Sequence, residues 1–309
     1  MKRTLILSIT ISIVWQLAAL AHTAATKDDS KSEAARTRAA ELISKAREAI
    51  GGDAKLKSLQ GLYASGTYRR VLGDREMSGE VEYEIMLPDH IRRTETLSPV
   101  PGMEITRVDV LNGTQVWSDS QTGGGGGGGM VMIRQAGGEN PQAQTAYEAA
   151  VRADFARQML GLLVTTIPTI PLTLSYVGEA EAPDGRADVI DVSGPEKLAG
   201  QFFLDQKSHR PLMLSYKGRL PRVVMRTFDG PAGHKDDIEK RTKEIEKDAS
   251  DAAPREVEMQ ISYEDYRNVG GIELPHRMTR SSAGKVTEQV EFKKFKLNPP
   301  LKPSNFEKK

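Results

Sequence analysis

Alternation of apolar and polar residues is the dominant pattern of this chain, and it is clearest between Ser78 and Trp117. Here Val81, Tyr83 and Ile85 alternate with glutamates, which is the side-chain period of a β-strand with one dry and one wet face. Pro88 ends this strand, because proline offers no N–H to a β-ladder and favours a turn. Several such strands in succession predict an antiparallel sheet whose dry face must be covered.

The dipeptide Asn112-Gly113 is the strongest hairpin signal in the chain. It joins a strand in which Val108 and Val110 share one face to a strand that carries Trp117. We therefore expect these three apolar side chains on the dry face of the sheet.

The alternating pattern returns in the second half of the chain. Strands are predicted at 172–177, 187–192, 201–204, 212–216, 223–228, 255–266, 272–280 and 286–297. In the strand at 255–266, the side chains of Met259, Ile261 and Tyr263 point inward. Glycines between the last strands mark turns, so the pattern predicts a meander of neighbouring strands in a mainly β (α+β) protein.

Two long helices accompany the predicted sheet. Residues 33–50 carry one apolar face, and residues 141–163 begin with a proline, which is a helix start signal. The second helix presents Phe155, Met159 and Leu163 in a broad apolar stripe. A stripe of this kind lies on a sheet or on lipid, and we interpret it as packing on the sheet.

The amino-terminal residues 1–21 have the layout of a secretory signal peptide. Lys2 and Arg3 precede an uncharged run, and residues 19–21 form a small-x-small cleavage pattern. The alternative, an uncleaved anchor, needs a longer apolar run. The chain has no cysteine and therefore no lipobox, so we expect an exported periplasmic protein with a cleaved signal peptide.

The rest of the chain is expected to form one domain. Residues 22–32 are a polar, flexible tail, and residues 33–309 are a single domain. This domain contains a glycine-rich loop at 121–140 and a charged insert at 229–254. The glycine run at 123–129 lacks the Lys-Ser or Lys-Thr pair of a phosphate-binding loop, so it is interpreted as a connector.

The composition gives no positive sign of catalysis. A formal net charge of +1, which stays near neutral after loss of the leader, offers no electrostatic case for nucleic acid. The histidines lack metal-ligand spacing, and no G-x-S-x-G elbow is present. We predict no catalytic, cofactor-binding or metal-binding residues, no cofactor, and a monomer.

A curved sheet with a greasy concave face can either enclose a helix or leave a cavity. Burying an acyl chain there gains about 0.8 kcal/mol per CH₂ group, so even a modest groove could hold a lipid tail. A completely filled core is the competing expectation.

Four segments carry a likeness to a known family. They are the G-x8-P strand Gly79–Pro88, the hairpin residues Asn112, Gly113 and Trp117, the L-D-x5-P-L segment 204–212, and the closing Asn298-Pro299-Pro300 with Phe306. Their order resembles the bacterial lipoprotein-carrier superfamily, which includes LolA, LolB and the outer-membrane lipoprotein-sorting proteins. The chain departs from that family at Leu87, where the carriers have an arginine, and in its glycine run and charged insert.

The resemblance implies a LolA-like, open antiparallel half-barrel, which we expect to have about ten or eleven strands, with helices covering its concave face. It also implies a non-catalytic protein that binds the acyl chain of a lipid or lipoprotein, with outer-membrane or other envelope proteins as further candidate partners. The candidate lipid-binding residues are Val81, Tyr83, Ile85, Val108, Val110, Trp117, Phe155, Met159, Leu163, Met259, Ile261 and Tyr263. Two alternatives remain open: an envelope protein-interaction or stress-sensing module with a filled core, and an exported hydrolase.

Overall fold

The structure is a computed structural model that describes residues 31–72, 75–98, 104–123, 130–134, 141–182, 185–195, 198–219, 223–227 and 256–308. The predicted signal peptide, most of the predicted tail and the predicted charged insert lie outside these residues.

A twelve-stranded antiparallel sheet dominates the fold, in the order β5-β4-β3-β2-β1-β14-β13-β12-β10-β9-β8-β7. Its strands are β1 (Gly61–Leu72), β2 (Arg75–Met86), β3 (His90–Leu97), β4 (Glu104–Asn112), β5 (Gln115–Gly123), β7 (Thr173–Ala182), β8 (Gly185–Ser193), β9 (Ala199–Asp205), β10 (Pro211–Arg219), β12 (Glu256–Val269), β13 (Ile272–Ser282) and β14 (Lys285–Leu297). Pairing of β1 with β14 joins the two halves of the chain into one sheet. The predicted fold class, an open antiparallel half-barrel, is confirmed, with one strand more than the predicted range.

Parts of the stretch predicted as a glycine-rich loop at 121–140 form strands, and the glycines at 124–129 lie outside the described residues. The last residues of β5 extend into this stretch, and β6 (Met130–Arg134) pairs antiparallel with β11 (Val223–Thr227). Val131 and Ile133 are β-branched residues that favour extended backbone. The glycines directly before them favour a loop, so the sequence pattern alone does not predict this short strand.

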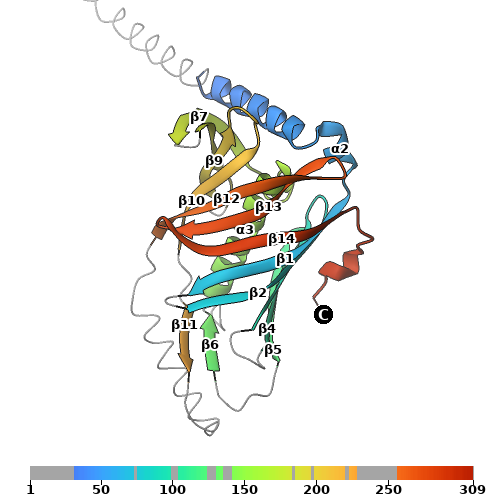
Figure 1. The fold of residues 1–309 in the computed structure, drawn as a ribbon, viewed down its shortest axis with the longest axis vertical. Helices are drawn as coiled ribbons and strands as arrows, with labels where there is room; N and C mark the ends of the chain where they lie inside the picture. Colours follow the sequence, from blue (N-terminus) through green and yellow to red (C-terminus); the bar gives the residue numbers. More distant parts are fainter. Residues whose placement is uncertain are drawn as a thin grey trace, which may run out of the picture.

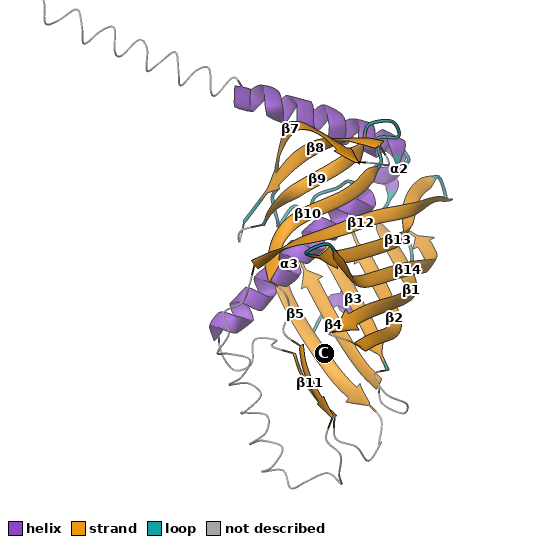
Figure 2. Ribbon diagram, turned by 60° about the vertical axis from the view of Figure 1, so that its left-hand side comes forward, coloured by secondary structure: helices purple, strands orange, loops and turns teal. Residues whose placement is uncertain are grey.

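The helices lie on the concave side of the large sheet. Figures 1 and 2 show α3 (Pro141–Leu163) crossing the hollow of the curved sheet, and it contacts β4 and β5 on one limb and β10 and β13 on the other. The amino-terminal helix, residues 31–49, runs along the end of the sheet that holds β7 and β8 (Figure 2). It ends where Gly51 and Gly52 adopt positive φ of 143° and 84°, and α2 (Asp53–Ser58) follows.

Two buried apolar layers result from this arrangement. The larger one lies between the concave face and the helices, and it includes Leu42 and Ile50 of the amino-terminal helix. The smaller one lies on the convex face, where the carboxy-terminal segment with η1 (Pro303–Phe306) contacts β3 and β4. There Phe306 is fully buried, and the Trp117 Nε1–H donates to its carbonyl oxygen at 3.0 Å.

Candidate functional site

The concave face under α3 brings most of the predicted binding residues together. Strand β2 contributes three of them, β12 contributes two and α3 contributes three, and each is at most 2% exposed in one continuous apolar cluster. These residues are Val81, Tyr83, Ile85, Ile261, Tyr263, Phe155, Met159 and Leu163. Met259 occupies the same face of β12 but is only partly buried. The predicted packing of the second helix on the sheet is thus confirmed.

Three predicted residues face the other way. Arg107 and Asp109 of β4 reach Tyr147 of α3, so they define the concave side of that strand. Because side chains alternate along a strand, Val108 and Val110 point to the convex side. Trp117, which pairs with Val110 across the ladder, lies there too.

The prediction that Val108, Val110 and Trp117 line the inner wall is therefore wrong. Apolar residues mark the concave face of a strand only where its convex face is wet. The carboxy-terminal segment makes the convex face of β3–β5 dry as well, since it covers Val110 and bonds to Trp117.

The carboxy-terminal half of α3 packs directly on the concave face of the sheet, which we call the wall. A Cβ atom on Gly161 would lie 2.0 Å from Cζ and 2.1 Å from the hydroxyl oxygen of Tyr263, so only glycine allows the helix to approach this closely. The Tyr263 hydroxyl also donates to the carbonyl oxygen of Arg157 at 3.4 Å. At Gly161 and Tyr263, therefore, no gap remains between α3 and the concave face of the sheet.

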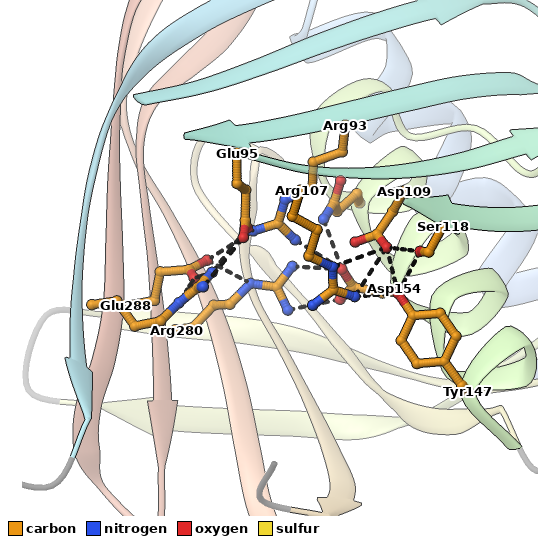
Figure 3. Close-up of polar contacts among 11 residues, drawn as sticks. Arg93, Glu95, Arg107, Asp109, Ser118, Tyr147, Asp154, Arg280 and Glu288 are labelled. Atoms are coloured by element: carbon orange, nitrogen blue, oxygen red, sulfur yellow. Dashed lines mark hydrogen bonds and ion pairs between the residues drawn. The ribbon is translucent and has the colours of Figure 1, made fainter. Parts of the chain in front are cut away.

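The middle of α3 meets a buried layer of charge, which we call the ionic cluster. It consists of Arg70, Arg93, Glu95, Asp154, Arg280 and Glu288. Figure 3 shows Asp154 of α3 facing Arg280 and Arg93 of the wall, at 2.7 Å from Arg280 and 3.4 Å from Arg93. These contacts tie the helix to β3 and β13 through side chains alone.

The carboxylates of the ionic cluster are held ionised by their arginine partners. Burial by itself would raise the pKa of Glu95, but the charges of Arg93 and Arg70 outweigh it and hold this pKa well below its usual range. The pKa values of Glu288 and Asp154 are lowered for the same reason. Burial, in contrast, raises the pKa of the Tyr83 hydroxyl, which stands beside the cluster, to about 12.

A second polar contact ties the amino-terminal half of α3 to the sheet. The Tyr147 hydroxyl donates to the Asp109 carboxylate and lies 2.6 Å from the Ser118 hydroxyl, and Arg107 contacts the same carboxylate at 2.9 Å (Figure 3). Burial, followed by the Asp109 charge, raises the pKa of Tyr147 to about 12, so this phenol is protonated at neutral pH. A protonated phenol is a hydrogen-bond donor rather than a base, so we interpret the group as a fastening for α3.

A pocket of about 490 Å³ lies outside the concave face, beside the β4–β5 turn. Polar and apolar atoms contribute about equally to its lining, which comes from the hairpin, α3 and the carboxy-terminal segment: Asn112, Thr114, Gln115, Val116, Trp117, Glu148, Arg152, Glu307 and Lys308. Sites for apolar ligands are lined mostly by hydrophobic side chains, so the concave face is the better candidate for an acyl chain.

The described part of the chain lacks two further features. No group of three or more histidine, aspartate or glutamate side chains there could hold a metal ion. None of the helices in that part combines the length and the apolar character that a membrane crossing requires.

Comparison with known proteins gives likenesses of structure. No family model matches the chain, and no curated protein matches it in sequence. Three similar solved structures are a LolA superfamily protein from Nitrosomonas europaea, an outer membrane lipoprotein-sorting protein domain from Vibrio parahaemolyticus, and a DUF1329 family protein from Desulfovibrio piger.

The numbers for these three structures are close to one another. Their identities are 12%, 10% and 8%, their TM-scores are 0.44, 0.45 and 0.44, and they cover 87%, 88% and 90% of this chain and 97% of each matched chain. The superfamily that the sequence resembles is thus present among the matching solved structures. Identities and TM-scores this low do not carry the activity of a relative to this chain.

Proposed function

We propose that this protein is an exported, non-catalytic binding protein of the bacterial envelope that takes up an acyl chain of a lipid or lipoprotein. The acyl chain replaces α3 on the concave face, so α3 acts as a removable cover that fills the site when no ligand is bound. The observation that carries this proposal is the apolar stripe of α3, buried on the open concave side of the sheet and fastened there by the ion pairs of Asp154 and the hydrogen bond of Tyr147.

The energies of this exchange are of comparable size. Uncovering Phe155, Met159 and Leu163 costs roughly 5–9 kcal/mol, at about 1.5–3 kcal/mol for each side chain. An acyl chain of about twelve methylene groups gains ~10 kcal/mol when it is buried on the same wall. An acyl chain can therefore offset the loss of these three apolar contacts, whereas a short ligand cannot.

The resemblance in the order of sequence segments supports the same class of ligand. The superfamily it points to is one of lipoprotein carriers, and the secretory layout of residues 1–21 supports export to the same compartment. Handover of the cargo to an envelope protein is part of this proposal.

Photo-crosslinking tests the proposal on the unmodified protein. A phospholipid with a diazirine at the end of one acyl chain is incubated with the protein, irradiated, and the labelled peptides are identified by mass spectrometry. We expect labels on concave-face residues such as Val81, Ile261 and Met159. Labels confined to the convex residues Val108 and Val110, or no labelling above that of the denatured protein, would contradict the proposal.

One observation favours the second candidate, a protein-interaction module with a filled core. The contact between Gly161 and Tyr263 leaves no gap between helix and wall at that position. If α3 never leaves the sheet, hydrogen exchange of its backbone amides will be unchanged when phospholipid is added. Faster exchange in α3 with lipid present would favour the carrier function instead.

A further inference from the structure

Arg157 of α3 is a buried cation without a carboxylate partner. Arg157 as a whole residue is only 8% exposed, and its Nε–H has no hydrogen-bond partner among the described residues. Among the described residues the guanidinium makes no hydrogen bond or ion pair. The guanidinium lies over the ring face of Tyr216, with its Cζ 3.8 Å from the ring centroid.

The nearest carboxylate is already engaged. Asp154 lies three residues before Arg157 and therefore on the same side of the helix. It accepts hydrogen bonds from Arg280 at 2.7 and 3.0 Å and from Gln158 at 3.0 Å, and it pairs with Arg93. In the ionic cluster the three arginines and three carboxylates balance in charge, so the cluster does not compensate the positive charge of Arg157.

A second buried polar group lies in the same row of the sheet. Tyr216 of β10 pairs with Met259 of β12, which pairs with Ser282 of β13. Ser282 is 5% exposed, and its hydroxyl oxygen has no hydrogen-bond partner. Neighbouring strands are about 4.8 Å apart, so Ser282 and Tyr216, on which Arg157 rests, are separated by about 10 Å across the wall.

Holding an arginine in this position is unfavourable for the empty protein. Burial lowers the pKa of Arg157, which means that the folded state disfavours its charge. A stacked aromatic ring recovers only part of the lost hydration. A guanidinium is suited to planar oxyanions, and the missing partner is therefore a phosphate or carboxylate group.

We propose that Arg157, with the Ser282 hydroxyl as a further donor, forms a binding site for the anionic headgroup of the lipid, phosphate or carboxylate, on the concave face. This inference rests on the proposed function, because the acyl chain occupies the neighbouring apolar wall. The protein would thereby select anionic lipids over neutral lipids with the same chains.

The experiment compares two lipids with identical acyl chains, phosphatidic acid and diacylglycerol, and uses inorganic phosphate as a third ligand. Affinities are measured for the wild type, Arg157→Met and Arg157→Lys by native mass spectrometry and by competition with a fluorescent lipid. The wild type should prefer phosphatidic acid about tenfold, the size of a charge-assisted hydrogen bond. The ratio should fall to about one in Arg157→Met and to an intermediate value in Arg157→Lys, which keeps the charge without the planar fork.

Thermal unfolding without ligand separates binding from a structural role. Arg157→Met removes a buried charge that lacks a partner, so its unfolding temperature should equal or exceed that of the wild type. Arg280→Met is the matched control, because it deprives Asp154 and Glu288 of one arginine partner each and should lower the unfolding temperature by several degrees.

Each outcome has a definite meaning. A wild type that binds both lipids equally, an unchanged ratio in Arg157→Met, or an Arg157→Met that unfolds well below the wild type would overturn the headgroup site and leave acyl-chain binding standing. Failure of both lipids to bind any variant would refute the proposed function itself. Arg157-dependent binding of phosphate, without a preference between the lipids, would assign the site to a free anion and overturn the headgroup assignment.

Discussion

The substitution Asp154→Asn removes the negative charge by which α3 is tied to the wall. In the wild type, Asp154 faces Arg280 at 2.7 Å and Arg93 at 3.4 Å. After the change Arg280 keeps Glu288, at 3.4 Å, as its remaining ion pair, and Arg93 keeps the two glutamates of the ionic cluster. The cluster, which is neutral in sum, gains one uncompensated positive charge.

Breaking a buried ion pair by removing one partner typically costs 3–5 kcal/mol. The Asp154 side chain is 23% exposed, so water screens part of its charge, and the asparagine oxygen still accepts a hydrogen bond. We therefore expect the free energy of unfolding to fall by about 2–3 kcal/mol.

Urea denaturation at pH 7 measures this loss, and Asp119→Asn provides the control. Asp119 is exposed on β5 and bonds only to its neighbours Ser120 and Gln121, so its substitution should change stability by less than ~0.5 kcal/mol. Hydrogen exchange in Asp154→Asn should also quicken in α3 before it does in the strands. A loss no larger than that of the control would refute the reasoning, because the ionic cluster would then not hold the helix.

Three further predictions concern the packing and the charges. Gly161→Ala gains ~1 kcal/mol of helix propensity but places a methyl group within the Tyr263 ring. Differential scanning calorimetry should therefore show a net destabilisation of about 1–2 kcal/mol, and a stabilised variant would contradict the contact. The lowered pKa values of the carboxylates in the ionic cluster contribute stability that is complete above the ordinary carboxyl pKa values of 3.8–4.5 and is lost as the pH falls further. The urea midpoint should therefore stay constant from pH 7 to about 5 and decrease below about pH 4.5. A decrease that starts at about pH 6 would be inconsistent with this explanation. Phe306→Ala should cost ~3 kcal/mol and shift Trp117 fluorescence to longer wavelength as water reaches the indole, and an unchanged spectrum would count against the packing of the carboxy-terminal segment.

Most of the secondary structure could be predicted from the sequence, because the signals for helices and strands are local. The helix Pro141–Leu163 has the bounds that its proline start and apolar stripe predict, and β2 follows the alternation of Val81 to Ile85. The pairing of β1 with β14, which closes the sheet across the chain, joins residues more than two hundred positions apart. No local pattern specifies that pairing; the likeness in the order of segments was the only indication of it.

The ionic cluster was missed although part of its signal was present. Ile91 and Leu97 fix the dry face of β3, and with a period of two this places Arg93 and Glu95 on the same face. Charged residues in such positions were overlooked because apolar residues were used to choose the wall. Their compensation by Asp154 depends on the position of α3 and could not be read from the strand alone.

The opposite error affected the apolar residues of β4. Val110 and Leu111 are adjacent in sequence and both fully buried, so the two faces of this strand are both dry. Alternation cannot identify the concave side of a strand that is covered on both faces. The covering segment ends in Phe306, which is distant in sequence from the strand it protects.

A disulfide between α3 and the wall tests most directly whether ligand uptake requires α3 to leave the sheet. The chain has no cysteine, so Gly161→Cys combined with Tyr263→Cys introduces a single pair where the helix meets the Tyr263 side chain of the wall, and bond formation is verified by mass. The reduced form of the same variant is the control. We predict that a fluorescent phospholipid binds the reduced form and loses at least about tenfold in affinity for the oxidised form; equal affinity in both forms would contradict the exchange of α3 for an acyl chain.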